Sequence, residues 1–195
     1  MKIVKKIILV SAFMGTCSFS MESGFIYNLG AHIGGDQIAQ ATNENGTTDY
    51  TWTHSGYSVK LGMYLEVTDL IGFTTTLGYM QGTAEGAYGD YYAFYRFPLE
   101  VAGVIDLGFI RLGVGLTSHL GTGLSLRDGA GGTLSSTKFS STLGQIYTLE
   151  FVQNYAGNEV HYGLQGTIIS YEANGISYSG DGLSGYVGMR LNLFN

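Results

Sequence analysis

The sequence has one cysteine, one proline, few charged residues and no long hydrophobic run. Because no stretch of eighteen apolar residues occurs, a membrane-spanning helix is excluded. Charged side chains are 12% of the 195 residues, about half the usual share, whereas glycine (31 residues) and tyrosine (15 residues) are abundant. This combination favours a membrane β-barrel, and the length suits a single domain.

Basic residues are also scarce, and three of the nine are lysines within the first six positions. A short apolar segment over 7–14 follows them, and residues 18–20 offer a suitable cleavage site at the usual spacing. We therefore predict a cleaved signal peptide over residues 1–20 and a mature barrel domain over residues 21–195. The apolar segment is too short to serve as a retained N-terminal anchor.

Cys17 lies inside the predicted leader. It would carry a lipid if the leader were that of a lipoprotein, but Thr16 before it fits a lipoprotein signal poorly. Cleavage after Ser20 leaves a mature chain without cysteine and therefore without a disulfide. That chain has six basic against fifteen acidic residues, a net charge of −9, which disfavours a nucleic-acid partner.

The most informative pattern is an alternation of apolar and polar residues. In the segment 57–65 every odd-numbered residue is apolar or aromatic, and the even-numbered positions include Lys60. A period of two indicates a β-strand with two different faces. Since the polar face carries charge, we predict a closed antiparallel barrel of eight strands with lipid outside and a polar lumen inside. The eight segments are approximately 24–34, 55–66, 70–81, 91–102, 108–120, 139–152, 160–171 and 183–194.

The predicted connections alternate between long and short. The long ones are rich in turn-forming residues and lie at about 36–54, 82–90, 121–138 and 172–182. The short ones lie at about 67–69, 103–107 and 153–159. Outer-membrane barrels have long outer loops and short periplasmic turns. An even number of strands then places both termini on the periplasmic side.

Aromatic residues near the predicted strand ends favour a membrane barrel over a soluble one, which would turn its apolar face inward. They are Tyr27, Tyr57, Tyr79, Tyr91, Phe109, Phe151 and Tyr162. Pro98 departs from the pattern, because proline cannot donate to a strand ladder. We expect it close to the periplasmic end of the fourth strand, where a bulge can accommodate it.

The predicted mature chain resembles the small eight-stranded outer-membrane barrels of the OmpA/OmpX type. The resemblance rests on the leader, the alternating segments, the loop rhythm and the terminal run from Gly185 to Phe194. It implies an up-and-down barrel in the outer membrane of a Gram-negative bacterium. It also implies contact with outer-membrane lipid and lipopolysaccharide, insertion by the barrel-insertion machinery, and a monomer.

Several charged residues fall in the inward phase, where they must pair or meet water. They are Lys60, Glu66, Arg96, Glu100, Arg111, Glu150 and Arg190, with His161 in the same phase. A two-residue turn at 105–106 would place Glu100 opposite Arg111, and one at 155–156 would place Glu150 opposite His161. The set is either a structural network or a gate, and the narrow interior of an eight-stranded barrel favours the network.

The four histidines invite a test for an enzyme, because some eight-stranded outer-membrane barrels modify lipid A. A hydrolase needs a nucleophile and a base within reach. Ser118 precedes His119, but adjacent strand residues point to opposite faces. No histidine is followed by a spacer and a serine, as it is in the deacylases. We therefore expect no enzymatic activity, no cofactor and no metal.

On these grounds we predict a structural or surface-interacting role: envelope integrity, adhesion, or host and phage contact through the long loops. One alternative is a small passive pore or a carrier of small hydrophobic molecules. A second alternative is a lipid A-modifying enzyme.

Overall fold

The computed structural model describes residues 23–192 apart from Gly131 and Ala156. The predicted leader, Cys17 and the terminal Phe194 lie outside the described residues. Among the described residues no helix is long and apolar enough to cross a membrane.

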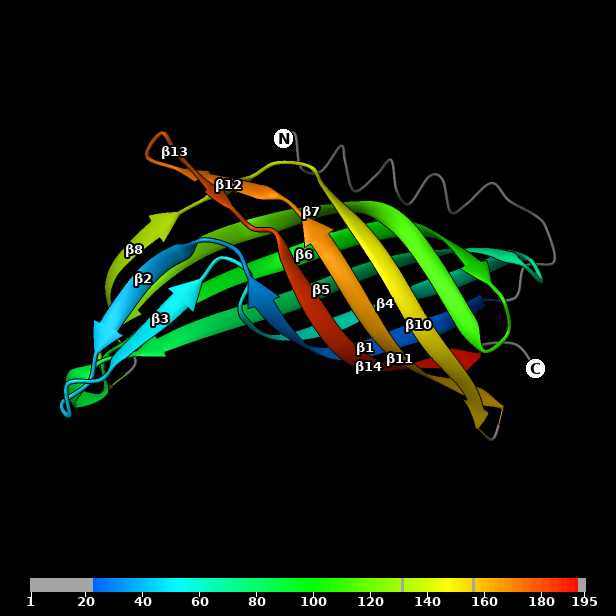
Figure 1. Ribbon diagram of the computed structural model, residues 1–195, viewed down its shortest axis with the longest axis horizontal. Helices are drawn as coiled ribbons and strands as arrows, with labels where there is room; N and C mark the ends of the chain where they lie inside the picture. Colours follow the sequence, from blue (N-terminus) through cyan, green and yellow to red (C-terminus); the bar gives the residue numbers. More distant parts are fainter. Residues whose placement is uncertain (1–22, 131, 156, 193–195) are drawn as a thin grey trace.

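Eight antiparallel strands form a closed ring, which confirms the predicted fold (Figure 1). Neighbours in the chain pair with one another, β10 pairs with β7, and β1 closes the ring on β14. The ring strands are β1 (Ser23–Gly34), β4 (Gly56–Thr68), β5 (Ile71–Glu85), β6 (Tyr91–Asp106), β7 (Ile110–Arg127), β10 (Gly144–Tyr155), β11 (Asn158–Ile168) and β14 (Gly182–Asn192).

The alternation in the sequence sorts side chains between the two faces of this ring. The predicted outward phase of β1 is exposed, including Phe25 and Leu29, and so is that of β14, including Val187 and Leu191. Charged and polar side chains of the other phase are buried. The ring therefore has an apolar outer surface and a polar interior, the inverse of a soluble barrel.

The connections differ between the two ends of the barrel. Short turns join strands at one end, at residues 69–70, at 107–109 and between Tyr155 and Asn158. We call this the turn end, and the opposite end the loop end. Both the start of β1 and the finish of β14 lie at the turn end, where Gly24 pairs with Asn192.

The long connections at the loop end contain strands of their own (Figure 1). They fold as short hairpins and extensions, strands that the turn-forming composition did not predict. These elements are β2 (Gln37–Thr42), β3 (Thr48–Trp52), the 3₁₀ turn η1 (Ala87–Gly89), β8 (Thr133–Lys138), β9 (Ser140–Ser141), β12 (Ser170–Ala173) and β13 (Ile176–Ser179). β8 extends the ring sheet along β7, and the β2–β3 hairpin contacts β5 and β6.

Loop aspartates hold these hairpins together through backbone N–H groups. The Asp36 carboxylate accepts a hydrogen bond from Ser179 N at 2.7 Å, which joins the first long connection to the last. Asp49 accepts one from Glu85 N at 3.0 Å. Charged acceptors make hydrogen bonds of this kind stronger than neutral ones. The loop end is therefore braced by its own acidic residues.

The strand register differs from the one expected at two turns. Asp106 belongs to β6 and pairs with Arg111, because Leu107 N bonds Ile110 O across a longer turn. Glu100 consequently pairs with Thr117 and not with Arg111.

The second correction concerns Glu150. The turn between β10 and β11 lies further along the chain than expected, because Tyr155 pairs with Asn158. Glu150 therefore pairs with Gly163, and His161 pairs with Val152.

Pro98 lies in the middle of β6, because that strand continues to Asp106. The expected position near its turn end was wrong. The ladder of β6 and β7 shifts by one residue nearby, between the pair Phe97–Leu120 and the pair Tyr95–Gly123. The extra residue of this bulge lies on β7 near Gly121, which has a φ of 56° that favours glycine.

Glycines on the inner wall make room for large side chains opposite them. A methyl group on Gly163 of β11 would overlap the ring of Tyr186 on β14, whereas one on Gly166 of the same strand would meet nothing within 4 Å. Gly163→Ala should lower the free energy of unfolding by about 1–3 kcal/mol, the usual cost of overpacking. Urea unfolding of the detergent-solubilised protein measures this, with Gly166→Ala as the matched control. Equal stability of the two variants would contradict the tight packing inferred here.

Candidate functional site

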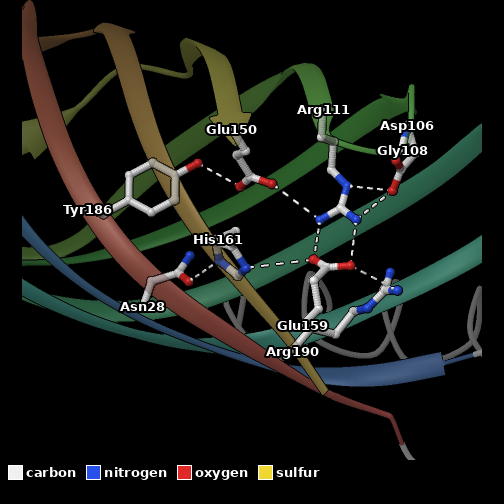
Figure 2. Close-up of polar contacts among 9 residues, drawn as sticks. All are labelled: Asn28, Asp106, Gly108, Arg111, Glu150, Glu159, His161, Tyr186 and Arg190. Atoms are coloured by element: carbon white, nitrogen blue, oxygen red, sulfur yellow. Dashed lines mark hydrogen bonds and ion pairs between the residues drawn. The ribbon is translucent and has the colours of Figure 1, made fainter. Parts of the chain in front are cut away.

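The polar interior begins at the turn end with a cluster centred on Arg111 (Figure 2). Its guanidinium donates to both carboxylate oxygens of Glu159, from Nη1 at 2.7 Å and from Nη2 at 2.9 Å. Nε and Nη2 also donate to Asp106 Oδ2, at 3.0 and 2.5 Å. Nη1 lies 3.3 Å from Glu150 Oε2. Bidentate pairing of this kind fixes geometry as well as charge.

A second arginine completes this turn-end cluster. Arg190 Nη2 lies 2.9 Å from Glu159 Oε2, so Glu159 bridges the two guanidinium groups. The Tyr64 ring lies close to both, with its centroid 4.8 Å from the Arg111 Cζ and 4.3 Å from the Arg190 Cζ. Cations over an aromatic face are stabilised further when they are desolvated. Two positive charges thus meet three carboxylates around one buried ring.

The cluster is extended toward the middle of the barrel by two more polar contacts (Figure 2). Tyr186 donates to Glu150 Oε1 at 2.6 Å. His161 Nε2 lies 2.8 Å from Asn28 Oδ1, and its Nδ1 lies 3.7 Å from Glu159 Oε1. These contacts tie together β10, β11, β14 and β1, which are consecutive around the ring.

The middle of the lumen holds a separate cluster around Lys60 and Glu100. Lys60 Nζ donates to the two oxygens of Glu100 at 2.8 and 2.9 Å and to Gln165 Oε1 at 3.1 Å. Gln165 Nε2 and Thr76 Oγ1 also donate to Glu100, at 3.0 and 3.1 Å. This middle cluster is electrically neutral, and both partners are buried.

A small cavity lies beside the middle cluster. It is lined by Asn28, His32, Ser58, Lys60, Gln165, Ser184 and Tyr186, and its volume is about 10 Å³. That is roughly the room for one water molecule. At this level side chains fill the lumen.

The loop-end part of the lumen holds a third cluster, formed by His32, His54, Arg96, His119 and Tyr171. The His32 and His54 rings lie 5.3 Å apart edge to face, and His119 Nδ1 is 2.5 Å from the Tyr171 hydroxyl. His54 lies in the connection between β3 and β4, outside the ring strands. Burial, together with the charges of Arg96 and Lys60, lowers the pKa of His54 to about 3, so its imidazole is neutral at neutral pH.

Arg96 differs from the other inward charges. It is fully buried, and among the described residues Nε, Nη1 and Nη2 have no hydrogen-bond partner. Its guanidinium lies 5.2 Å from the centroid of the Phe94 ring. Sequence reasoning placed Arg96 in a network of paired charges, and the structure does not pair it.

The remaining predicted lumen residues divide between the first two clusters. Lys60 and Glu100 pair with each other, and Arg111 contacts Glu150. Arg190 pairs with Glu159. Glu66 is half-buried in the inward phase of β4, with Tyr64 within electrostatic reach. His161 faces Asn28 and Glu159 instead of Glu150.

Sequence reasoning missed the two carboxylates that hold Arg111 most closely. Asp106 was assigned to a turn, and Glu159 lay one residue before the expected start of its strand. Glu159 precedes His161 by two residues and therefore shares its inward phase, which is the signal that identifies it.

A serine and a histidine are hydrogen-bonded inside the barrel, although not the pair tested from the sequence. Ser58 Oγ lies 2.6 Å from His32 Nε2, and both residues are buried. His32 Nδ1 has no partner among the described residues, so no carboxylate orients the ring as in a triad. In the described part of the chain, no three His, Cys, Asp or Glu side chains come together as a metal site.

Comparison with solved structures identifies the architecture. The attachment invasion locus protein Ail of Yersinia pestis, solved with the heparin analogue sucrose octasulfate, matches with a TM-score of 0.55 and 10% identity over 90% of this chain and 100% of that chain. Neisserial surface protein A matches with a TM-score of 0.52 and 14% identity over 87% of this chain and 97% of that chain. No protein-family model and no curated protein sequence matches. The chain thus has the fold of these small outer-membrane barrels.

Removal of Arg111 should destabilise the barrel strongly. Arg111→Met leaves Asp106, Glu150 and Glu159 close together without their main counter-charge, at an expected cost of about 3–5 kcal/mol in the free energy of unfolding. The double variant Arg111→Met, Glu159→Gln should recover part of this loss, because it removes the most deeply buried carboxylate.

Urea unfolding of the detergent-solubilised protein measures both variants. Arg190→Met provides the matched control and should cost less, because Arg190 is more exposed and pairs with Glu159 alone among the described carboxylates. If Arg111→Met were no less stable than Arg190→Met, Arg111 would not be the centre of the cluster.

Proposed function

We propose that this chain is a non-enzymatic barrel of the Gram-negative outer membrane whose loop end makes contacts at the cell surface. The exposed apolar outer wall supports residence in lipid, because such a surface on a soluble monomer would promote association. Residues from every ring strand contribute to it, among them Phe25, Leu61, Phe73, Phe97, Val114, Tyr147, Leu164 and Val187.

The two ends of the barrel support an orientation. Short turns are typical of the periplasmic side and long connections of the outer side. With this orientation, both termini are periplasmic, and the hairpins at the loop end extend toward lipopolysaccharide and the exterior. The resemblance to small outer-membrane barrels also supports insertion by the barrel-insertion machinery and a monomeric state.

The observation that supports surface contact over transport is the filled interior. The turn-end and middle clusters cross the lumen, and the cavity beside the middle cluster has room for about one water. The loop end is then the part of the molecule available for contact with partners, because the ring holds its hydrogen-bonded hairpins in place there.

The loop end carries exposed apolar side chains that suit a protein partner. Tyr50 and Trp52 lie 6.4 Å apart between ring centroids on β3, and Tyr88 of η1 is 87% exposed. Aromatic residues of this kind are enriched among the energetically dominant residues of interfaces.

The charge of the loop end indicates which partners to expect. The long connections carry eight carboxylates, at Asp36, Glu44, Asp49, Glu85, Asp90, Asp128, Glu172 and Asp181, against two basic residues, Arg127 and Lys138. Ail was solved with a sulfated heparin analogue, but a surface this acidic repels polyanions. A neutral or basic protein surface is the better partner for this chain.

The enzyme alternative has one observation in its favour, the Ser58–His32 hydrogen bond. That pair lines the small cavity, which has no room for an acyl chain. The pair therefore supports interior packing more than lipid A chemistry.

The pore alternative is tested by conductance. The purified protein, inserted into planar bilayers, should show no stable open channel, because two polar layers cross its lumen. A known outer-membrane porin inserted under the same conditions serves as the positive control. Reproducible channels from the unaltered protein would favour a pore over a surface-contact barrel.

The surface-contact proposal is tested by adhesion. A Gram-negative strain that lacks its own adhesins and displays this protein should bind host epithelial cells or matrix proteins above the vector background. The triple variant Tyr50→Ala, Trp52→Ala, Tyr88→Ala should reduce that binding about tenfold or more, as expected when central aromatic contacts are removed.

Tyr155→Ala is the matched control, because Tyr155 is an exposed tyrosine at the turn end. Faster gel migration without heating should show that every variant still folds as a barrel. An equal loss of binding in Tyr155→Ala, or no binding by the unaltered protein, would refute the surface-contact role.

A further inference from the structure

Arg96 is a buried charge whose counter-charge is missing from the described protein. Arg96 lies on β6 in the inward phase, and its side chain is fully buried. None of its three guanidinium nitrogens has a hydrogen-bond partner among the described residues. Arginine stays protonated in proteins. A buried charge without a partner carries a large desolvation penalty, so a compensating group is required.

The nearest inward carboxylate along the strand is already in use. Glu100 follows Arg96 by two inward positions on β6, and both its oxygens accept hydrogen bonds from the middle cluster. Lys60 neutralises Glu100. The loop-end part of the lumen therefore keeps one uncompensated positive charge.

The side chains around Arg96 cannot supply the negative charge, but they offer free polar atoms. Arg96 pairs with Met80, which pairs with Ser58, so Arg96 lies two strands from the Ser58–His32 pair. Its charge also acts on His54, whose imidazole is a neutral hydrogen-bonding group in this setting.

Two polar atoms of the inward phase are buried without a partner among the described residues. They are His32 Nδ1 on β1 and Thr117 Oγ1 on β7, whereas the His54 ring also interacts with the Gly180 backbone. Buried polar atoms are rarely left unpaired, and each such atom points to a bound water or ion.

We propose that the loop-end cluster binds a small monovalent anion, of the size of chloride, as the counter-ion of Arg96. The guanidinium supplies the charge, and neutral imidazole N–H and threonine O–H groups supply further donors. Close packing limits the size, because Phe94 beside the guanidinium is fully buried, as are Met80, the strand partner of Arg96, and Pro98, two residues along β6. A phosphate or a lipid headgroup is too large for this space.

The anion makes the stability of the barrel depend on chloride. A ligand that binds the folded state alone stabilises it in proportion to the logarithm of its concentration. At constant ionic strength, replacement of gluconate by chloride should raise the midpoint of thermal unfolding of the detergent-solubilised protein by several degrees. Loss of heat-modifiable gel migration measures that midpoint.

Two variants test whether the chloride-dependent shift in thermal unfolding arises at Arg96. Arg96→Met should abolish the chloride shift, and in gluconate it should be at least as stable as the unaltered protein, because the uncompensated charge is gone. Arg127→Met removes a half-buried arginine elsewhere at the loop end and should keep the full shift. A chloride shift that survives in Arg96→Met, or no shift in the unaltered protein, would overturn the proposal.

A second measurement needs no variant to fold. Crystals of the unaltered protein soaked in bromide should show an anomalous peak within hydrogen-bond distance of the Arg96 guanidinium. A water molecule there without anomalous signal would mean that no halide binds, and the proposal would fail.

Discussion

The narrowness of an eight-stranded ring is the constraint on which the rest of this structure depends. Side chains from strands that are not paired meet inside it, so Lys60 of β4 reaches Gln165 of β11 and Asn28 of β1 reaches His161 of β11. An inward charge therefore finds its partner on another strand or has none. The polar clusters and the inner glycines are two solutions to this lack of space.

The alternation of the sequence was sufficient to predict the eight ring strands and the direction in which each side chain points. It could not predict which residues meet, because register depends on turn length. One longer turn moved Asp106 into β6 and set it opposite Arg111, while Glu100 came to face Thr117. Glu159 was missed as a partner of Arg111 because it lies one residue before the range expected for its strand.

The loop end was the least predictable part, since its turn-forming composition describes irregular loops and braced hairpins equally well. Its order comes from non-local hydrogen bonds such as that between Asp36 and Ser179. The bulge near Gly121 also could not be predicted, because a single extra residue leaves the alternation on either side intact. The isolation of Arg96 also could not be read from the sequence, which gives its inward phase but not its neighbours.

The position of the turn-end cluster has a kinetic consequence. The β10–β11 hairpin carries Glu150 and Glu159, whereas their arginine partners lie on β7 and β14, up to 48 residues away in the chain for Arg111. A hairpin that entered an apolar phase alone would take two unneutralised carboxylates with it. Docking of both flanking strands and burial of the hairpin must therefore occur together, which makes closure of the ring an all-or-none step dominated by distant contacts.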